Sequence, residues 1–144
     1  MNAGLLLELQ IDSDLRQVVD ACRAWQRLAG QLELGEEAAG EVELALCEAV
    51  NNAIIHAHGQ RAGYTVRITV RRDDGWLIVR IHDEGKATGP DLPAVEAPGG
   101  TVDLDEGGRG LRIIQALMWR VRYLPHSGGN TLEMRYPLPG GTED

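Results

Sequence analysis

The chain has 144 residues, of which 43% are hydrophobic and 25% are charged, and this composition suits one domain with a hydrophobic core. A formal net charge of −8 argues against tight non-specific binding to nucleic acid or to an anionic membrane surface. No apolar run approaches the roughly 18 to 20 residues of a membrane span, and no basic segment precedes the short run at residues 5–7. We therefore expect a cytoplasmic protein without a signal peptide or a membrane span.

The first part of the chain combines one strand with two helices. Residues 5–11 place leucine or isoleucine at every second position, which predicts a strand. Apolar positions at helical spacing over residues 15–29 predict a helix that ends near Gly30. A second amphipathic helix is predicted from about residue 36 to about residue 57, with Gly59 just beyond it as a stop signal.

Both cysteines fall within these two helices. The neighbours of Cys22 and Cys47 place them towards the core faces. We expect them to be small, buried, apolar thiols in a reducing compartment.

From residue 66 the apolar pattern changes from a helical period to alternation. Residues 66–71 and 76–83 predict two strands, joined by a tight hairpin turn with the sequence Asp-Asp-Gly at 73–75. Asp83 shares a face with the apolar residues of the second strand, so it is predicted to point inward at the strand end. A carboxylate in that position is costly unless it meets a hydrogen-bond donor.

The rest of the chain contains a long connection, a short helix and two strands. Residues 84–107 are irregular, and because such long connections are usually functional or mobile, we interpret this segment as a lid. Glycines at 107, 108 and 110 then open a short apolar helix. Strands are predicted at 119–124 and 130–138, and residues 139–144 are expected to form a flexible tail.

The predicted order is strand, two helices, two strands, lid, helix and two strands. Because the strands follow one another with short links, we expect a mixed, mostly antiparallel sheet with helices on one face. The sequence therefore predicts an α+β fold, a two-layer sandwich that forms a single domain over residues 1–144. This is not the alternating pattern of a Rossmann or P-loop protein, and no Walker-type motif is present.

Two segments of this fold carry polar side chains that suit a nucleotide. Glu48 and Asn52 stand four residues apart on the second helix, so they lie one turn apart on the same side. The Asn52 oxygen suits Mg²⁺, whose other positions water and phosphate oxygens would fill. Asp83 is an acceptor suited to the amino group of adenine, and Gly85 lets the backbone pass close to a flat ring. Glu48 is placed to take a proton from an attacking hydroxyl or water.

A third segment, the glycine turn before the last helix, suits the phosphates. Backbone N–H groups from Gly107 to Gly110 lie at a helix N-terminus, which attracts phosphate. Arg109 is expected to add charge-assisted contacts to the phosphate oxygens.

These positions form an ordered set: Glu48-x-x-x-Asn52, then Asp83-x-Gly85, then Gly108-x-Gly110-Leu111. The set is much more specific than any of its parts, and it resembles the GHKL (Bergerat-fold) ATPase superfamily. Within that superfamily the chain is most similar to the small, stand-alone anti-sigma-factor serine kinases of the RsbW and SpoIIAB type. Residues 46–56, 83–85 and 107–117 look like the N, G1 and G2 boxes of these proteins.

The resemblance implies a role for each of these segments. Asn52 would hold Mg²⁺, Glu48 would be the catalytic base, and Asp83 would read the adenine of ATP or ADP under a lid formed by residues 84–107. Members of the family phosphorylate a serine on a small STAS-domain anti-sigma-factor antagonist, and many also bind a sigma factor, commonly as homodimers. The resemblance therefore implies a protein serine kinase that doubles as an anti-sigma factor, with no direct contact to nucleic acid or membrane.

The sequence departs from the family pattern in three places. Ala87 stands where many members have a second glycine after Asp83, and Glu106 lies where some carry an arginine that reaches the γ-phosphate. These departures leave open an alternative, a nucleotide-gated binding module that sequesters a partner without useful kinase activity. A plain α+β domain with chance motif matches would bind neither ATP nor ADP. The family often has a threonine in the last strand near the adenine, but strand parity places Asn130 rather than Thr131 on the apolar face, so we predict that Asn130 faces the site.

Two further groups of polar residues lie outside this pattern. His56 and His58 point about 200° apart on a helix, so they do not share a metal ion, and we interpret them as surface or helix-end residues. Arg67, Arg71 and Arg80 fall on the outer strand face, where they either solvate the sheet or dock an acidic protein.

Overall fold

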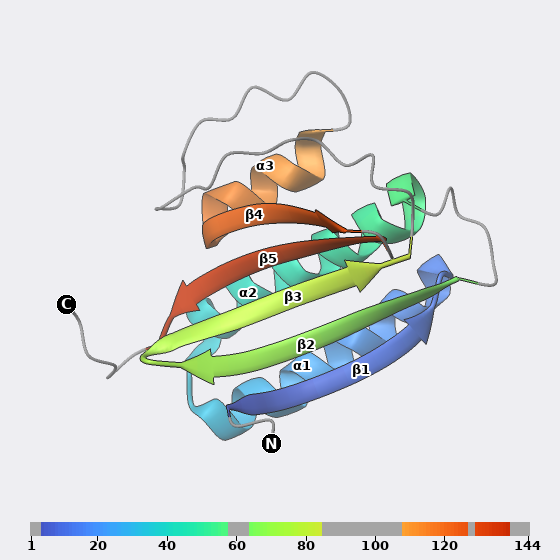
Figure 1. Ribbon diagram of the computed structural model, residues 1–144. Helices are drawn as coiled ribbons and strands as arrows, with labels where there is room; N and C mark the ends of the chain where they lie inside the picture. The colour runs from blue at the N-terminus through green and yellow to red at the C-terminus, as the bar shows by residue number, and fades with distance from the viewer. Residues whose placement is uncertain (1–3, 58–63, 85–107, 127–128, 139–144) are drawn as a thin grey trace.

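The computed structural model describes residues 4–57, 64–84, 108–126 and 129–138, in which a layer of helices covers one face of a sheet (Figure 1). The sheet has the strand order β1-β2-β3-β5-β4, and every neighbouring pair is antiparallel. This confirms the predicted α+β sandwich. None of the helices in these ranges is long and apolar enough to cross a membrane. The elements are β1 (Leu5–Asp12), α1 (Val18–Leu32), α2 (Glu36–Asn52), β2 (Thr65–Asp73), β3 (Trp76–Asp83), α3 (Gly108–Leu117), β4 (Trp119–His126) and β5 (Gly129–Pro137).

The first helix begins after an aspartate cap and runs past its predicted end. The side chain of Asp14 accepts a hydrogen bond from the backbone N–H of Arg16, which opens a 3-10 turn at Leu15–Gln17 just before α1. The helix then continues through Gly30 to Leu32, and Glu33 caps its end with a left-handed φ of 57°. The predicted end at Gly30 was wrong because one glycine costs a helix only about 1 kcal/mol, and the packing of α1 outweighs this cost.

The second helix contacts both of the other helices and supplies much of the core. Its buried residues recur at the predicted helical spacing: Val42, Ala45, Leu46, Ala49 and Val50. After Asn52 the chain continues as a π-helical turn at Ala53–Ala57, so the predicted extent is confirmed with a wider last turn. His58 and the predicted stop at Gly59 lie outside the described residues.

The two cysteines are joined to one another. Cys22 of α1 and Cys47 of α2 form a disulfide, and their Cα atoms lie 6.5 Å apart. The prediction of two free thiols was therefore wrong. Helical periodicity places each cysteine on a face of its own helix, but it does not reveal that α1 and α2 pack side by side at the distance that a disulfide spans.

The predicted hairpin joins β2 to β3. Its turn residues Asp74 and Gly75 have φ values of 54° and 82°, as a two-residue turn that follows the strand twist requires. On β3 the residues facing the helices are buried, and the last of them is Asp83. The strand therefore carries Asp83 to the inner side of the sheet, as its parity predicted.

A shift of register interrupts β1 between Leu5 and Leu7. Leu7, Leu9 and Ile11 pack against the core, whereas Leu5 pairs with Arg71 and lines the outer face of the sheet. The unbroken alternation predicted from residue 5 was wrong at this position, because a bulge turns the first residue of the strand to the other face.

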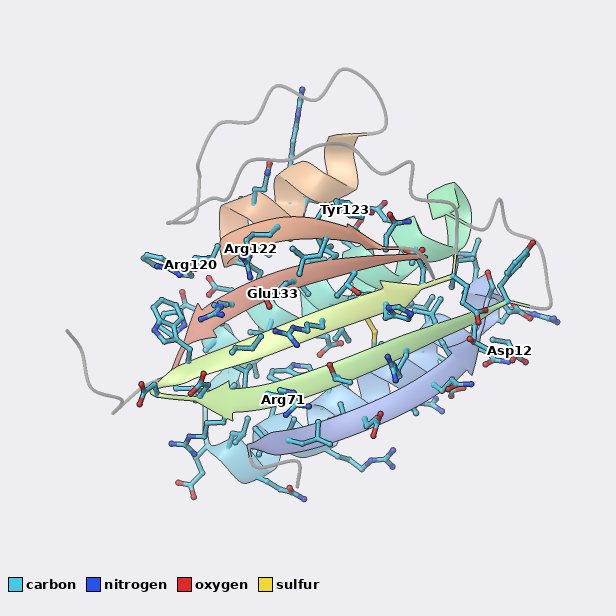
Figure 2. The ribbon with its side chains drawn as sticks, in the orientation of Figure 1. Asp12, Arg71, Arg120, Arg122, Tyr123 and Glu133 are labelled. Carbon is cyan, nitrogen blue, oxygen red and sulfur yellow. A yellow bond between two sulfur atoms is a disulfide. The ribbon has the colours of Figure 1, made fainter. Side chains whose placement is uncertain are left out.

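On the outer face of the sheet, the carboxylate of Glu133 on β5 is buried (Figure 2). Its Oε1 accepts a hydrogen bond from Arg122 of β4 at 2.6 Å, and its Oε2 accepts one from Arg80 of β3 at 2.9 Å. Burial alone would raise the pKa of Glu133, but the hydrogen bonds and charges of Arg122 and Arg80 outweigh it and hold that pKa below its ordinary value. This cluster ties three neighbouring strands together on their outer side.

Candidate functional site

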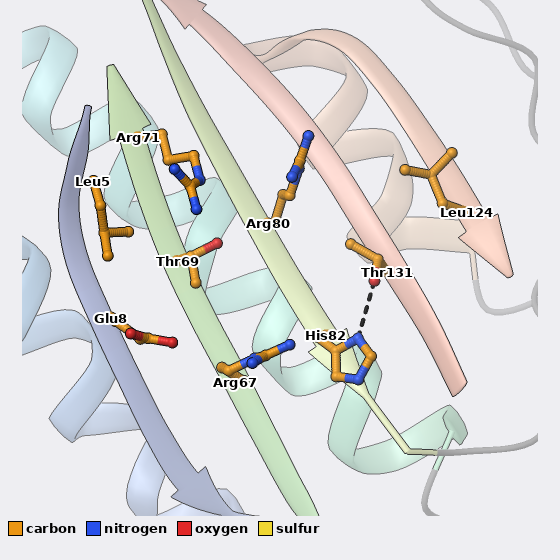
Figure 3. A pocket seen from close by; sticks show the side chains of 9 residues that line it. All are labelled: Leu5, Glu8, Arg67, Thr69, Arg71, Arg80, His82, Leu124 and Thr131. Carbon is orange, nitrogen blue, oxygen red and sulfur yellow. Dashed lines mark hydrogen bonds between the residues drawn. The ribbon is translucent and has the colours of Figure 1, made fainter. Parts of the chain in front are cut away.

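Asp83 lies at the end of β3 on the inner side of the sheet, with 2% of its surface exposed. Its register partner on β5 is Asn130, equally buried, whose Nδ2 donates a hydrogen bond to Asp83 Oδ1 at 3.2 Å. A buried carboxylate needs such a donor because it has lost its water. The pair confirms the predicted strand face. Thr131 points to the outer face, where its Oγ1 lies 3.0 Å from Nδ1 of His82 (Figure 3).

Tyr123 is a neighbour of this pair that the sequence pattern did not single out. It lies on β4 (Figure 2) and packs against the hydrophobic core. Burial raises the pKa of Tyr123, and the negative charge of Asp83 contributes to the rise, which reaches about 12. The phenol is therefore a neutral hydrogen-bond donor near Asp83. In the sequence, the alternation of Val121 and Tyr123 in the strand before Asn130 was the pattern that could have indicated an inward-facing Tyr123.

Gly129 sets how closely β5 approaches the end of β3. It has a φ of +144°, and a Cβ atom at this position would lie 1.9 Å from the backbone carbonyl oxygen of Asp83. No side chain fits in that gap, so the close pairing that brings Asn130 onto Asp83 requires glycine. In the sequence, Gly129 falls in the connection between the predicted strands at 119–124 and 130–138, and nothing there marks its role, which depends on an approach between distant segments.

The C-terminal end of α2 lies beside the arrowhead of β3 (Figure 1), and the π-helical turn after Asn52 contacts that strand. Glu48 and Asn52 are both half-buried, so each is partly shielded from water and still accessible. The fold thus brings the helix end that carries Asn52 next to the strand end that carries Asp83.

The side-chain oxygens at this edge of the sheet determine which kind of magnesium site the structure could form. Among the residues that the structure describes, no group of three or more His, Cys, Asp or Glu side chains is arranged to hold a metal ion. Asn52 offers one hard oxygen, and Mg²⁺ is ordinarily held by one or two protein oxygens with water and phosphate oxygens completing the shell. The residues therefore fit a magnesium ion that arrives with a nucleotide rather than one in an all-protein cage.

α3 begins at Gly108, as the glycine pattern predicted, and packs against α2. Residues 108–111, the predicted phosphate-binding set, form its first turn, where backbone N–H groups lack partners within the helix and attract anions. The side chains of Arg109 and Leu111 lie outside the described parts. Residues 85–107, which are the predicted lid apart from Glu84 and include Gly85 and Gly107, and the predicted tail at 139–144 also lie outside them.

The sequence matches the histidine kinase-like ATPase domain family over residues 11–136. The anti-sigma F factor of Caldanaerobacter subterraneus subsp. tengcongensis is 30% identical over 135 residues, which are 92% of this chain and 88% of that protein. The serine-protein kinase RsbW of Bacillus subtilis is 33% identical over 101 residues, 67% of this chain and 63% of the kinase. An anti-sigma F factor of Clostridium botulinum (strain Eklund 17B) is 32% identical over 90 residues, and the match spans 61% of this chain and 62% of that relative.

A solved structure shares the fold. The crystal structure of the RsbU and RsbW domains of a Mycobacterium tuberculosis protein has a TM-score of 0.62 with this chain at 18% sequence identity. The similar region covers 92% of this chain and 32% of the other. The likeness extends to the arrangement of the antiparallel sheet and its helical layer.

Proposed function

This chain belongs to the histidine kinase-like ATPase domain family, and on that premise we propose that it is an ATP-dependent protein serine kinase of the anti-sigma-factor type. The observation that carries the proposal is the buried Asp83–Asn130 pair at the sheet edge, beside the end of α2. Burial of a carboxylate at a strand end costs free energy of desolvation, and a carboxylate held there suits recognition of an amino group on a flat base.

In this proposal the nucleotide lies between the sheet edge and the ends of two helices. Asp83 accepts a hydrogen bond from the adenine amino group, and Asn130 holds the carboxylate in its position. Asn52 holds Mg²⁺, and the N–H groups of residues 108–111 bind phosphate oxygens. Bound ATP supplies the phosphoryl group, and Glu48 accepts the proton that the partner's serine hydroxyl gives up.

The proposed partners follow from the kinds of protein to which this chain is similar. Relatives named anti-sigma F factor and serine-protein kinase RsbW support a sigma factor as one partner and a protein serine as the phosphorylation site. We propose that this serine lies on a STAS-domain antagonist, as the family resemblance implies. We place this activity in the cytoplasm, in a homodimer that binds neither nucleic acid nor membrane.

Two measurements test the proposal. Calorimetry with ATP and ADP in the presence of Mg²⁺ tests binding, and incubation with labelled ATP and candidate STAS-domain proteins tests transfer to a serine. Glu48→Ala should keep nucleotide binding and lose phosphotransfer. Glu37→Ala is a matched control, because Glu37 is exposed in the first turn of the same helix, about 16 Å away along its axis. Equal turnover by Glu48→Ala and its parent would remove Glu48 from the mechanism.

The second candidate function is the nucleotide-gated binding module, which Ala87 and Glu106 favour. Tight, nucleotide-dependent complexes with a STAS-domain protein or a sigma factor, without label on any serine, would select this module over the kinase. Absence of ATP and ADP binding would exclude both functions.

A further inference from the structure

The face of the sheet opposite the helices contains a hollow of about 510 Å³. Residues from all five strands line it, and the helices of the described ranges lie on the other face, so the hollow opens away from them (Figures 1 and 3). Asp83 and Asn130 point to the helical side. A molecule in the hollow and a nucleotide at the inner edge therefore occupy opposite faces of the same sheet.

The hollow is rich in positive charge although the chain as a whole is acidic. Its lining carries three arginines, Arg67, Arg71 and Arg80, against one carboxylate, Glu8. Arg80 is paired with Glu133, at 2.7 Å. Arg67 and Arg71 form no ion pair with any described residue, and Figure 3 shows the guanidinium of Arg67 extending across β2 towards the next strand. The carboxylate of Glu8 offsets one of these two charges, so the lining keeps an excess of one positive charge.

The spacing of these groups indicates the shape of the ligand. Arg67 and Arg71 lie on one face of β2, four residues and therefore about 13 Å apart along the strand. Arg80 pairs in register with Thr69 and so lies between them on β3. A single phosphate is too small to reach both ends of this row. An extended peptide with acidic side chains at alternate positions repeats about every 6.7 Å, which places carboxylates at each level of the row.

Apolar side chains flank the basic row on two sides. Leu5 of β1 and Leu124 of β4 lie at opposite sides of the hollow (Figure 3), where they offer contact area to a peptide backbone or to apolar side chains. The bulge in β1 is what turns Leu5 to this face.

Charge also discriminates between possible occupants. The net charge of −8 repels a nucleic acid or an anionic membrane, whose charge extends far beyond the hollow. A symmetric contact with a second copy of this chain would bring the arginines of the two hollows together, where their positive charges repel one another. In each copy, Glu8 is the carboxylate of the lining that would offset this repulsion. A short acidic segment places its charge inside the hollow alone.

We infer that this arginine-lined hollow binds an extended, acidic segment of a protein partner. The inference goes beyond the proposed kinase function and does not need it, because the hollow and the nucleotide edge lie on different faces of the sheet. A chain that failed to bind ATP would still be expected to bind the acidic segment.

The test uses the full chain labelled with ¹⁵N and a blocked ten-residue peptide of alternating glutamate and serine. Peptide addition should shift amide signals of β2 and β3 in a saturable way, and the affinity should fall as salt is raised. Arg67→Glu with Arg71→Glu should weaken binding at least tenfold. The control is Arg23→Glu with Arg27→Glu, which makes the same change of net charge at two exposed positions of α1 and should leave binding within twofold. Urea unfolding checks that each variant folds, and Arg67→Gln with Arg71→Gln replaces the first variant if it does not.

Four outcomes would overturn the inference. Equal loss of binding in the control would mean general electrostatic attraction, and absence of saturable shifts in β2 and β3 would mean that the hollow does not bind such a peptide. Binding of inorganic tripolyphosphate without binding of the peptide would make it a small-anion site. A concentration-dependent dimer abolished by the Arg67→Glu and Arg71→Glu variant, together with no peptide binding, would assign the face to contact between copies of this chain.

Discussion

Replacement of Asp83 by asparagine should strongly weaken nucleotide binding while leaving the protein folded. Asparagine has nearly the same shape as aspartate and keeps one oxygen that can accept the hydrogen bond donated by Asn130 Nδ2 at 3.2 Å. Its other terminal atom is an NH₂ donor where the parent has an acceptor. In the variant this donor would face the donating amino group of adenine.

The expected loss of binding free energy follows from the hydrogen bond that adenine loses and from the donor that replaces its acceptor. A hydrogen bond to a charged acceptor contributes about 1.5–3 kcal/mol, and a donor left facing another donor costs about 1–3 kcal/mol. We expect binding to weaken by about 3 kcal/mol, which is roughly a 150-fold increase in the Kd for ATP. The free energy of unfolding should change by no more than about 1 kcal/mol, because the gain from removing a buried charge offsets the weaker hydrogen bond with Asn130.

Calorimetry with ATP and ADP measures the first quantity, and urea unfolding measures the second. A third readout needs no nucleotide. The pKa of Tyr123, about 12 in the parent, should fall in the Asp83→Asn variant, because the charge of Asp83 is one cause of its rise after burial. Alkaline difference spectra against a Tyr123→Phe variant isolate this tyrosine. A folded Asp83→Asn protein that binds ATP within threefold of the parent would refute the assignment of Asp83 to adenine.

The remaining predictions concern stability. Glu133→Gln should lower the free energy of unfolding by about 2 kcal/mol at pH 7, because the NH₂ group of glutamine cannot accept the hydrogen bond of one of the two arginines. The side chains of Arg80 and Arg122 are 42% exposed, so hydrogen bonds to water offset part of this loss. The pKa of Glu133 is lowered in the folded state, so its stabilisation is present above the pKa of an unfolded glutamate, near 4.3, and is lost as the pH falls. The free energies of unfolding of Glu133→Gln and of the parent, measured with urea, should therefore converge in acid. A difference between them that stays constant with pH would contradict the role of the cluster. The pKa of Tyr123 is raised, so its contribution is present below the unfolded value near 10 and is lost as the pH rises towards 12; Tyr123→Phe should therefore lose stability less steeply than the parent in alkali. Reduction of the Cys22–Cys47 disulfide, which spans a sequence separation of 25, should lower the free energy of unfolding by about 3 kcal/mol, and a thiol assay that finds two free cysteines before reduction would contradict the bond.

Local periodicity was sufficient for much of the site. Alternation in β3 predicted that Asp83 points inward, and alternation in β5 predicted that Asn130, not Thr131, does the same. Because both predictions count residues from an apolar face within one strand, they needed no knowledge of how the strands pair. The register then places the two residues opposite one another.

Features that depend on the approach of distant segments could not be predicted in this way. The disulfide requires the packing of α1 on α2, and the need for Gly129 comes from the Asp83 carbonyl, 46 positions earlier in the chain. Tyr123 has an ordinary alternation pattern, and only the pairing of β4 with β5 brings it near Asp83. Leu5 reverses its face through a bulge for which the leucine-rich sequence gives no marker.

The last strand of the chain, β5, lies inside the sheet between β3 and β4. During synthesis Asp83 therefore leaves the ribosome 47 residues before Asn130, an interval of roughly 2–10 s at ordinary translation rates. Until β5 inserts, the flank of β3 is open and the carboxylate has no amide beside it. A stalled or proteolytically shortened product that ends before residue 129 would thus lack the Asp83–Asn130 pair and, with it, the proposed adenine contact.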